Sequence, residues 1–96
     1  MLPKEDPQEF YSRFHQQLTE SQEWPGSYMF KFIVRTESSH LDDLKALFSA
    51  DKPHFSEKQS AKKNFVSLSV TAFFSSPNQI IDIYKSAKKF KGVITL

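Results

Sequence analysis

The chain has 96 residues and a formal net charge of +2 at pH 7, which is enough sequence for one domain and too little for a second hydrophobic core. It contains no cysteine, which excludes disulfides, thiol nucleophiles and thiolate metal sites. Its two glycines, Gly26 and Gly92, lie too far apart for a P-loop or a dinucleotide-binding fingerprint. Ten Phe, three Tyr and one Trp give this short chain large apolar side chains to bury.

Charge is divided unevenly along the sequence. Residues 1–24 carry a balance of −3, so the remainder carries +5. Apolar runs such as Phe32-Ile33-Val34 are far shorter than the ~20 residues of a membrane span or the ~7–15 of a signal peptide. We therefore expect a soluble, cytoplasmic protein that makes no membrane contact.

A first helix is predicted from Pro7 to a point before Trp24. The segment Asp6-Pro7-Gln8-Glu9 is typical of a helix start, because Asp can cap the helix and Pro suits its first position. Three apolar residues at intervals of four then give the helix one apolar face: Phe10, Phe14 and Leu18. The proline after Trp24 disfavours helix there, so the helix should end before it.

A first strand is predicted over Tyr28 to Arg35, because the apolar residues alternate with period two. One face holds Tyr28, Phe30, Phe32 and Val34, and the other holds Met29, Lys31, Ile33 and Arg35. Ser38 or Ser39 can then cap a second helix. Its apolar residues repeat at helical spacing: Leu41, Leu44, Leu47 and Phe48.

Two more strands and a third helix follow. The residues from His54 to Ser60 are polar enough for an edge strand, and a hairpin tip at 61–64 leads into a strand over Phe65 to Phe74. Ser76-Pro77-Asn78-Gln79 predicts a second capping box. The inward stripe of the third helix is then Ile80, Ile83, Tyr84 and Ala87, and a last strand covers 93–96.

Without the first helix, the element order is strand, helix, strand, strand, helix, strand. This order predicts an α+β fold, the ferredoxin-like βαββαβ sandwich, with a four-stranded antiparallel sheet and two helices on one face. We expect residues 1–23 to form an N-terminal amphipathic helical extension and residues 24–96 to form the ferredoxin-like domain.

The second face of such a sheet is left open by its two helices. The alternation places Met29, Lys31, Ile33 and Arg35 there, with Phe65, Ser67, Ser69, Thr71 and Phe73 from the third strand. An apolar patch of this kind usually has a cover, and the helix with Phe10, Phe14 and Leu18 is a candidate. That helix could pack on its own domain, dock on a second subunit or bind a partner, so these three residues are also candidate interaction residues.

Several activities known on this architecture lack their residues. The loop at 36–39 has neither the thiolate pair of a metal chaperone nor the glycine-rich anion loop of an acylphosphatase. His15, His40 and His54 lie on three different predicted elements, and no nucleophile elbow surrounds any serine. We therefore expect no metal site, no cofactor and no catalytic residue.

RNA-recognition modules stack bases on aromatic side chains of the first and third strands. Lys63 and Phe65 fit that pattern, but Ser67 stands where a second ring is needed, and the first strand supplies no outward ring. We therefore do not expect nucleic acid as the partner, although Lys58, Lys62 and Lys63 would permit weak backbone contacts.

Three motifs occur in order from residue 24 to residue 96. They are the aromatic-Pro turn and Tyr-Lys strand in 24–33, the basic hairpin tip and serine-containing strand in 60–70, and the segments Asn78-Gln79-Ile80-Ile81-Asp82-Ile83-Tyr84 and Gly92-Val93. In their order and spacing they resemble the YbeD-like family of small bacterial proteins of unknown function.

That resemblance implies a ferredoxin-like fold close to the small-ligand regulatory domains of the ACT type, without an assigned activity. The chain departs from the family pattern in three ways: Val34 and Lys63 stand where the family usually has glycine, and the lead before residue 24 is longer. The missing glycines weaken the analogy with amino-acid-binding ACT domains, because such sites need close backbone approach.

Two functions remain open. The first is a non-catalytic protein-interaction or regulatory domain that binds an unknown protein, or itself, through the open face or the first helix. The alternative is an ACT-like sensor of a small anionic metabolite, with Lys31, Arg35, Lys58 and Ser67 as candidate contacts.

Overall fold

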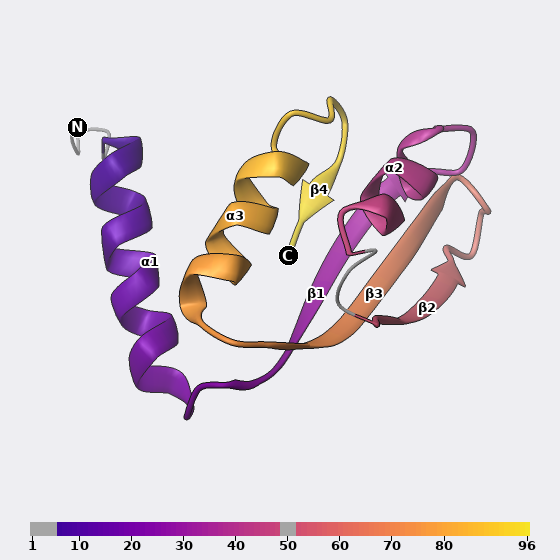
Figure 1. The fold of residues 1–96 in the computed structure, drawn as a ribbon. Coiled ribbons are helices and arrows are strands. Elements are labelled where there is room, and N and C mark those ends of the chain that lie inside the picture. The colour runs from indigo at the N-terminus through magenta and orange to yellow at the C-terminus, as the bar shows by residue number, and fades with distance from the viewer. Residues whose placement is uncertain (1–5, 49–51) are drawn as a thin grey trace.

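A computed structural model of the chain describes residues 6–48 and 52–96; the first five residues of the predicted N-terminal extension lie outside this part. Along the described residues the elements are α1 (Pro7–Ser21), β1 (Gly26–Arg35), α2 (His40–Ala46), β2 (His54–Gln59), β3 (Phe65–Phe74), α3 (Pro77–Ala87) and β4 (Ile94–Thr95). Their order is the predicted one (Figure 1). The last strand is shorter than expected.

The four strands form one antiparallel sheet in the order β2-β3-β1-β4. β1 and β3 pair along their whole length, from Gly26 opposite Phe74 to Arg35 opposite Phe65. β2 and β4 are the edges, as expected for a polar β2. The ferredoxin-like fold is therefore confirmed.

Local capping accounts for where the helices begin. The Asp6 carboxylate accepts a hydrogen bond from the Gln8 N–H at 3.1 Å, so the predicted cap of α1 is confirmed. At α3 the predicted capping box begins one residue earlier, at Ser75 in place of Ser76. The backbone of Ser76 is extended and its hydroxyl makes no cap bond, while the Gln79 side-chain oxygen accepts from the Ser75 N–H at 2.7 Å and from the Ser75 hydroxyl at 3.0 Å.

Aromatic rings fill the centre of the core, between the sheet and the helices. Phe30 is fully buried, and its ring centroid lies between 4.8 and 5.9 Å from five other rings. Those rings belong to Tyr28, Phe32, Phe48, Phe74 and Tyr84. Among the described residues every buried side chain is apolar, which explains why the hydrogen-bonded polar groups are gathered at the periphery.

The alternation along β1 and β3 sets the two faces of the sheet. Phe30, Phe32 and Val34 are buried against α2 and α3, while Met29, Lys31 and Arg35 are exposed on the other side. We call that other side the open face. By strand register it comprises Ser27, Met29, Lys31, Ile33 and Arg35 of β1, His54, Ser56 and Lys58 of β2, Phe65, Ser67, Ser69, Thr71 and Phe73 of β3, and Ile94 of β4.

Helix α1 packs beside α3 on its own domain, at the side of the molecule, and does not lie over the open face (Figure 1). Leu18 is only 4% exposed, and the Phe14 ring lies 5.3 Å from that of Tyr84. The link from α1 to β1 is short. It is held back against α1 by the Trp24 indole N–H, which donates a hydrogen bond to the Leu18 carbonyl at 2.9 Å. This link holds α1 on the helical side of the sheet.

The helix with Phe10, Phe14 and Leu18, a candidate cover of the open face, therefore does not cover it (Figure 1). Phe14 lies among the helices, and the centroid of the tilted Phe10 ring is 6.2 Å from that of Phe14. Phe65 and Phe73 belong to the open face and remain exposed. The Phe10 and Phe14 rings thus lie on one side of the sheet, and the Phe65 and Phe73 rings lie on the other.

The hairpin tip between β2 and β3 contains a residue in the left-handed region, Lys63, with φ +60°. Its carbonyl accepts a hydrogen bond of 2.6 Å from the Thr36 hydroxyl, so the loop after β1 holds this conformation. A non-glycine residue there costs about 1–2 kcal/mol, whereas glycine costs about 0.5–1 kcal/mol in chain entropy.

Lys63→Gly is therefore expected to raise the free energy of unfolding by about 0.5–1 kcal/mol. Urea denaturation followed by circular dichroism measures the change. Lys62→Gly is the control, since Lys62 is not among the positive-φ residues and should gain nothing. Equal losses of stability in both variants would contradict the strain at Lys63.

Candidate functional site

The open face is the candidate site, since both core helices and α1 lie elsewhere. Its cations are Lys31 and Arg35 of β1 and Lys58 of β2. No Asp or Glu occupies an open-face position of the four strands. The one acidic residue within the strands, Glu57, faces the helical side, where the Lys45 ammonium donates to it at 2.6 Å. The open face therefore attracts negative charge.

The register brings the four predicted contact residues to this one face. Lys58 stands directly opposite Ser67, and Lys31 stands opposite Ser69 on the same strand. Arg35 stands opposite Phe65 at one end of the face. Lys31 and Arg35 are about 13 Å apart along β1 at the usual rise per residue. The residues share a surface without forming a compact cluster.

Arg35 is directed toward the end of the face. Its guanidinium carbon lies 5.8 Å from the centre of the Phe65 ring, and one of its nitrogens is 3.6 Å from the Glu37 carboxylate just beyond β1. Both side chains of this ion pair are well exposed, so solvent screens it and it adds little stability. Arg35 thus keeps its charge available to a partner at that end.

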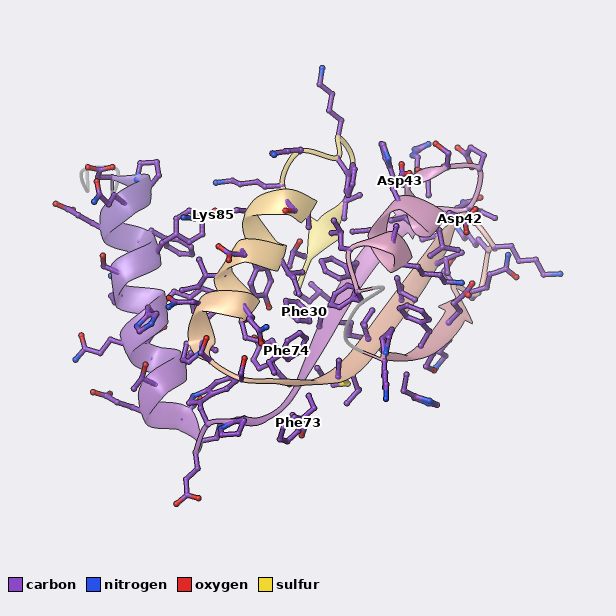
Figure 2. The ribbon with its side chains drawn as sticks, in the orientation of Figure 1. Phe30, Asp42, Asp43, Phe73, Phe74 and Lys85 are labelled. Carbon is purple, nitrogen blue, oxygen red and sulfur yellow. The ribbon has the colours of Figure 1, made fainter. Side chains whose placement is uncertain are left out.

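Exposed apolar side chains accompany the cations. Met29 is 58% exposed and Phe73 is 64% exposed, and Ile94 is exposed at the β4 edge. Figure 2 shows Phe73 outside the fold, next to Phe74, which points into the core near Phe30. Exposed apolar side chains mark an interaction surface, and the cations at the strand positions of this face favour a partner of opposite charge.

The candidate interaction residues on α1 are largely used within the chain. Leu18 is buried, and Phe14 is partly buried against Tyr84. Only Phe10, at 45% exposure, still presents a large apolar surface. The geometry therefore favours the open face over α1 as the surface for a partner.

A groove between α1, α3 and β4 was not predicted from the sequence. Its volume is about 570 Å³, and it is lined by residues that include Phe10, Phe14, Tyr28, Tyr84, Lys88 and Thr95. The hydroxyls of Tyr28 and Tyr84 lie 3.0 Å apart and share a hydrogen bond. Both tyrosines were expected in the core, and only the position of α1 shows that they also border a cavity.

Histidine and carboxylate groups do not gather into a metal site in the part of the chain that the structure describes; no three such side chains lie close enough to hold an ion. His40 Nδ1 is 3.1 Å from an Asp43 carboxylate oxygen, one turn away on α2. Asp42 and Asp43 lie in the first turn of that helix, where their charge favours the helix dipole (Figure 2).

The sequence motifs and this fold agree with a family comparison. A family model described as "Protein of unknown function (DUF493)" matches residues 19–96. The chain belongs to the DUF493 family. This is the YbeD-like family that the motifs resemble, so the resemblance is confirmed over most of the chain. The matched region contains the whole sheet and the open face of this DUF493 chain.

Among solved structures, the DUF493 chain is similar to the ACT domain from GTP pyrophosphokinase of Chlorobium tepidum. The TM-score is 0.55 at 11% sequence identity, over 74% of this chain and 97% of that domain. This likeness shows an ACT-like fold. No curated protein matches the chain. None of the described helices is both long and apolar enough to cross a membrane.

Proposed function

We propose that this DUF493 domain is a non-catalytic, cytoplasmic regulatory module that binds an acidic segment of another protein across its open face. The observation that carries the proposal is the composition of that face: three cations, several exposed apolar side chains and no carboxylate at the strand positions that belong to the face. Such a surface favours a partner that combines negative charge with apolar side chains.

The spacing of the cations supports an extended partner. Lys31, Arg35 and Lys58 stand on two strands that are separated by β3, and Arg35 turns toward Phe65 at one end. A compact anion would contact only part of this set, whereas a polypeptide segment can run across all of it. The exposed Met29 and Phe73 would then contact apolar residues of the same segment.

The ACT-like fold supports a regulatory role, because the family resemblance implies a fold close to regulatory domains of that type. No part of the proposal requires a cofactor or a catalytic step. RNA is the competing polyanion, and the open face lacks the row of outward rings on both central strands that base stacking would use.

Charge reversal tests this function. The double variant Lys31→Glu/Lys58→Glu is expected to lose at least tenfold in affinity for its partner, since like charges across an interface repel. The matched control is Lys89→Glu/Lys91→Glu, two exposed lysines outside the open face. The measurement is affinity capture from native lysate, with and without nuclease, followed by titration of the recovered protein.

The proposal requires that the control retains the same partner and that the partner's contact segment is acidic. Recovery of an equal amount of that partner by the Lys31→Glu/Lys58→Glu variant would contradict it. Loss of the captured material after nuclease treatment would instead make nucleic acid the ligand. Both doubles change exposed side chains, so circular dichroism should show equal stability.

The alternative function, a sensor of a small anionic metabolite, is favoured by one observation: Lys58, Ser67 and Lys31 lie on neighbouring rows of one face. A thermal-shift screen of anionic metabolites distinguishes the two functions. A sensor gains about 2.7 kcal/mol of stability at a ligand concentration 100 times the dissociation constant. An interaction module shows no such gain until its protein partner is added.

A further inference from the structure

The groove between α1, α3 and β4 lies on the helical side of the sheet, and the proposed open-face function leaves it unused. Its volume of about 570 Å³ is within the range of about 300–1,000 Å³ that is usual for small-molecule sites. Aromatic and aliphatic side chains form most of its wall, among them Phe10, Phe14 and Val93. Phe10 remains 45% exposed, so a bound apolar molecule would remove further apolar surface from water.

A pair of tyrosines supplies a directional polar group in this apolar groove. The Tyr28 and Tyr84 hydroxyls are 3.0 Å apart, and the bond between them uses only one of their two protons. The second proton can be donated to a ligand. Burial, together with the hydrogen bond to Tyr28, raises the pKa of Tyr84 well above its ordinary value, so its hydroxyl stays protonated even at alkaline pH.

Among the described residues, the charged side chain that lines the groove is a cation. Lys88 is among its lining residues, and none of the described residues that line it is Asp or Glu. The neighbouring cation, Lys85, reaches across from α3 to α1, with its ammonium 4.8 Å from the centre of the Tyr11 ring (Figure 2). Lys88 approaches the same ring less closely, at 5.9 Å. An anionic head group would therefore meet a cation and hydroxyl donors.

We propose that this groove binds a small apolar carboxylic acid. The hydrocarbon or aryl body of the ligand lies against Phe10, Phe14 and Val93, and its carboxylate accepts hydrogen bonds from Lys88 and the tyrosine pair. Hydrogen bonds to an ionised carboxylate are about twice as strong as neutral ones, which selects an acid over an alcohol of the same length. This site is separate from the one proposed for a protein partner.

Titration of the full chain with octanoate, followed by amide chemical shifts, tests the site, and 1-octanol serves as the neutral match. We expect saturable shifts at groove residues such as Ala87 and Thr95. Lys88→Gln should weaken octanoate about tenfold, the loss expected for a charge-assisted hydrogen bond, and leave 1-octanol unchanged. Lys89→Gln, the same change at the next residue outside the groove lining, should bind octanoate like the wild type.

Tyr84→Phe provides a second probe, because it keeps the ring and removes the hydroxyl; it should weaken octanoate severalfold. Lys88 is exposed, so Lys88→Gln keeps the test decisive even if the tyrosine variant loses stability.

The proposal is overturned if the chemical shift changes caused by octanoate do not saturate, or if Lys88→Gln and Lys89→Gln weaken octanoate binding equally. It is also overturned if the groove amides shift with protein concentration alone, which would show a second copy in the groove. Octanoate binding should be unaffected by Lys31→Glu/Lys58→Glu, so the two proposals fail separately.

Discussion

Phe30→Ala is expected to lower the free energy of unfolding by about 3–5 kcal/mol, the usual loss for removing a buried ring. Phe30 is fully buried, and five other aromatic rings surround it, so no neighbour can move in without disturbing a second packing contact. Domains are stable by only about 5–15 kcal/mol, so this loss is a large part of the total. Urea denaturation at equilibrium measures it.

Two variants make this result interpretable. Phe30→Leu keeps much of the volume and should lose less, which gives a folded comparison if the alanine variant is largely unfolded. Phe73→Ala removes an equally large ring from the open face, where it is 64% exposed, and should change stability by less than about 0.5 kcal/mol. Similar losses for Phe30→Ala and Phe73→Ala would mean that the open face is covered by part of the chain itself.

Leu18→Ala is expected to lower the free energy of unfolding by about 2–5 kcal/mol. Leu18 is 4% exposed and belongs to the same core cluster as Phe30, although it lies on the N-terminal helix. Its backbone carbonyl also accepts the hydrogen bond from Trp24 that folds the link against α1. Loss of this side chain should therefore weaken both the docking of α1 and the core beneath it.

Gln17→Ala is the matched control, since Gln17 is the exposed neighbour on the same helix and alanine favours helix. A change of less than about 0.5 kcal/mol is expected there. If Leu18→Ala were equally mild, α1 would contribute little to the folded domain, and its apolar face would again be a candidate surface for another chain. The pair of variants thus decides whether α1 is structural.

The composition of the candidate site was predictable because it depends on strand alternation. Lys31 and Arg35 share a face by their spacing alone, and Ser67 follows from the alternation of β3. The place of Lys58 opposite Ser67 needed the hairpin register as well. The direction of Arg35 toward Phe65 and Glu37 was not predictable, because a flexible side chain takes its direction from neighbours that the fold brings near.

For the first helix, the sequence predicted the helix but not the surface on which it packs. The spacing of Phe10, Phe14 and Leu18 predicted an amphipathic helix, and the Asp6 cap predicted its start. Two apolar surfaces were available to that helix, the open face and the outer side of α3. The choice between them depended on the folded-back link at Trp24 and on the Tyr84 ring, which lies 70 residues after Phe14 in sequence.

The length and the order and period of the apolar residues determined by themselves that this chain forms one ferredoxin-like domain, with Lys31 and Arg35 on the open face of its sheet. These properties are local, because strand and helix geometry convert spacing directly into faces. Only the tertiary structure decided that α1 packs beside α3, and that a groove with a tyrosine pair forms between them. Where a helix docks depends on which apolar surfaces of distant elements it can bury and on how far the links between the elements reach. The spacing of residues within one helix or strand contains no information about either.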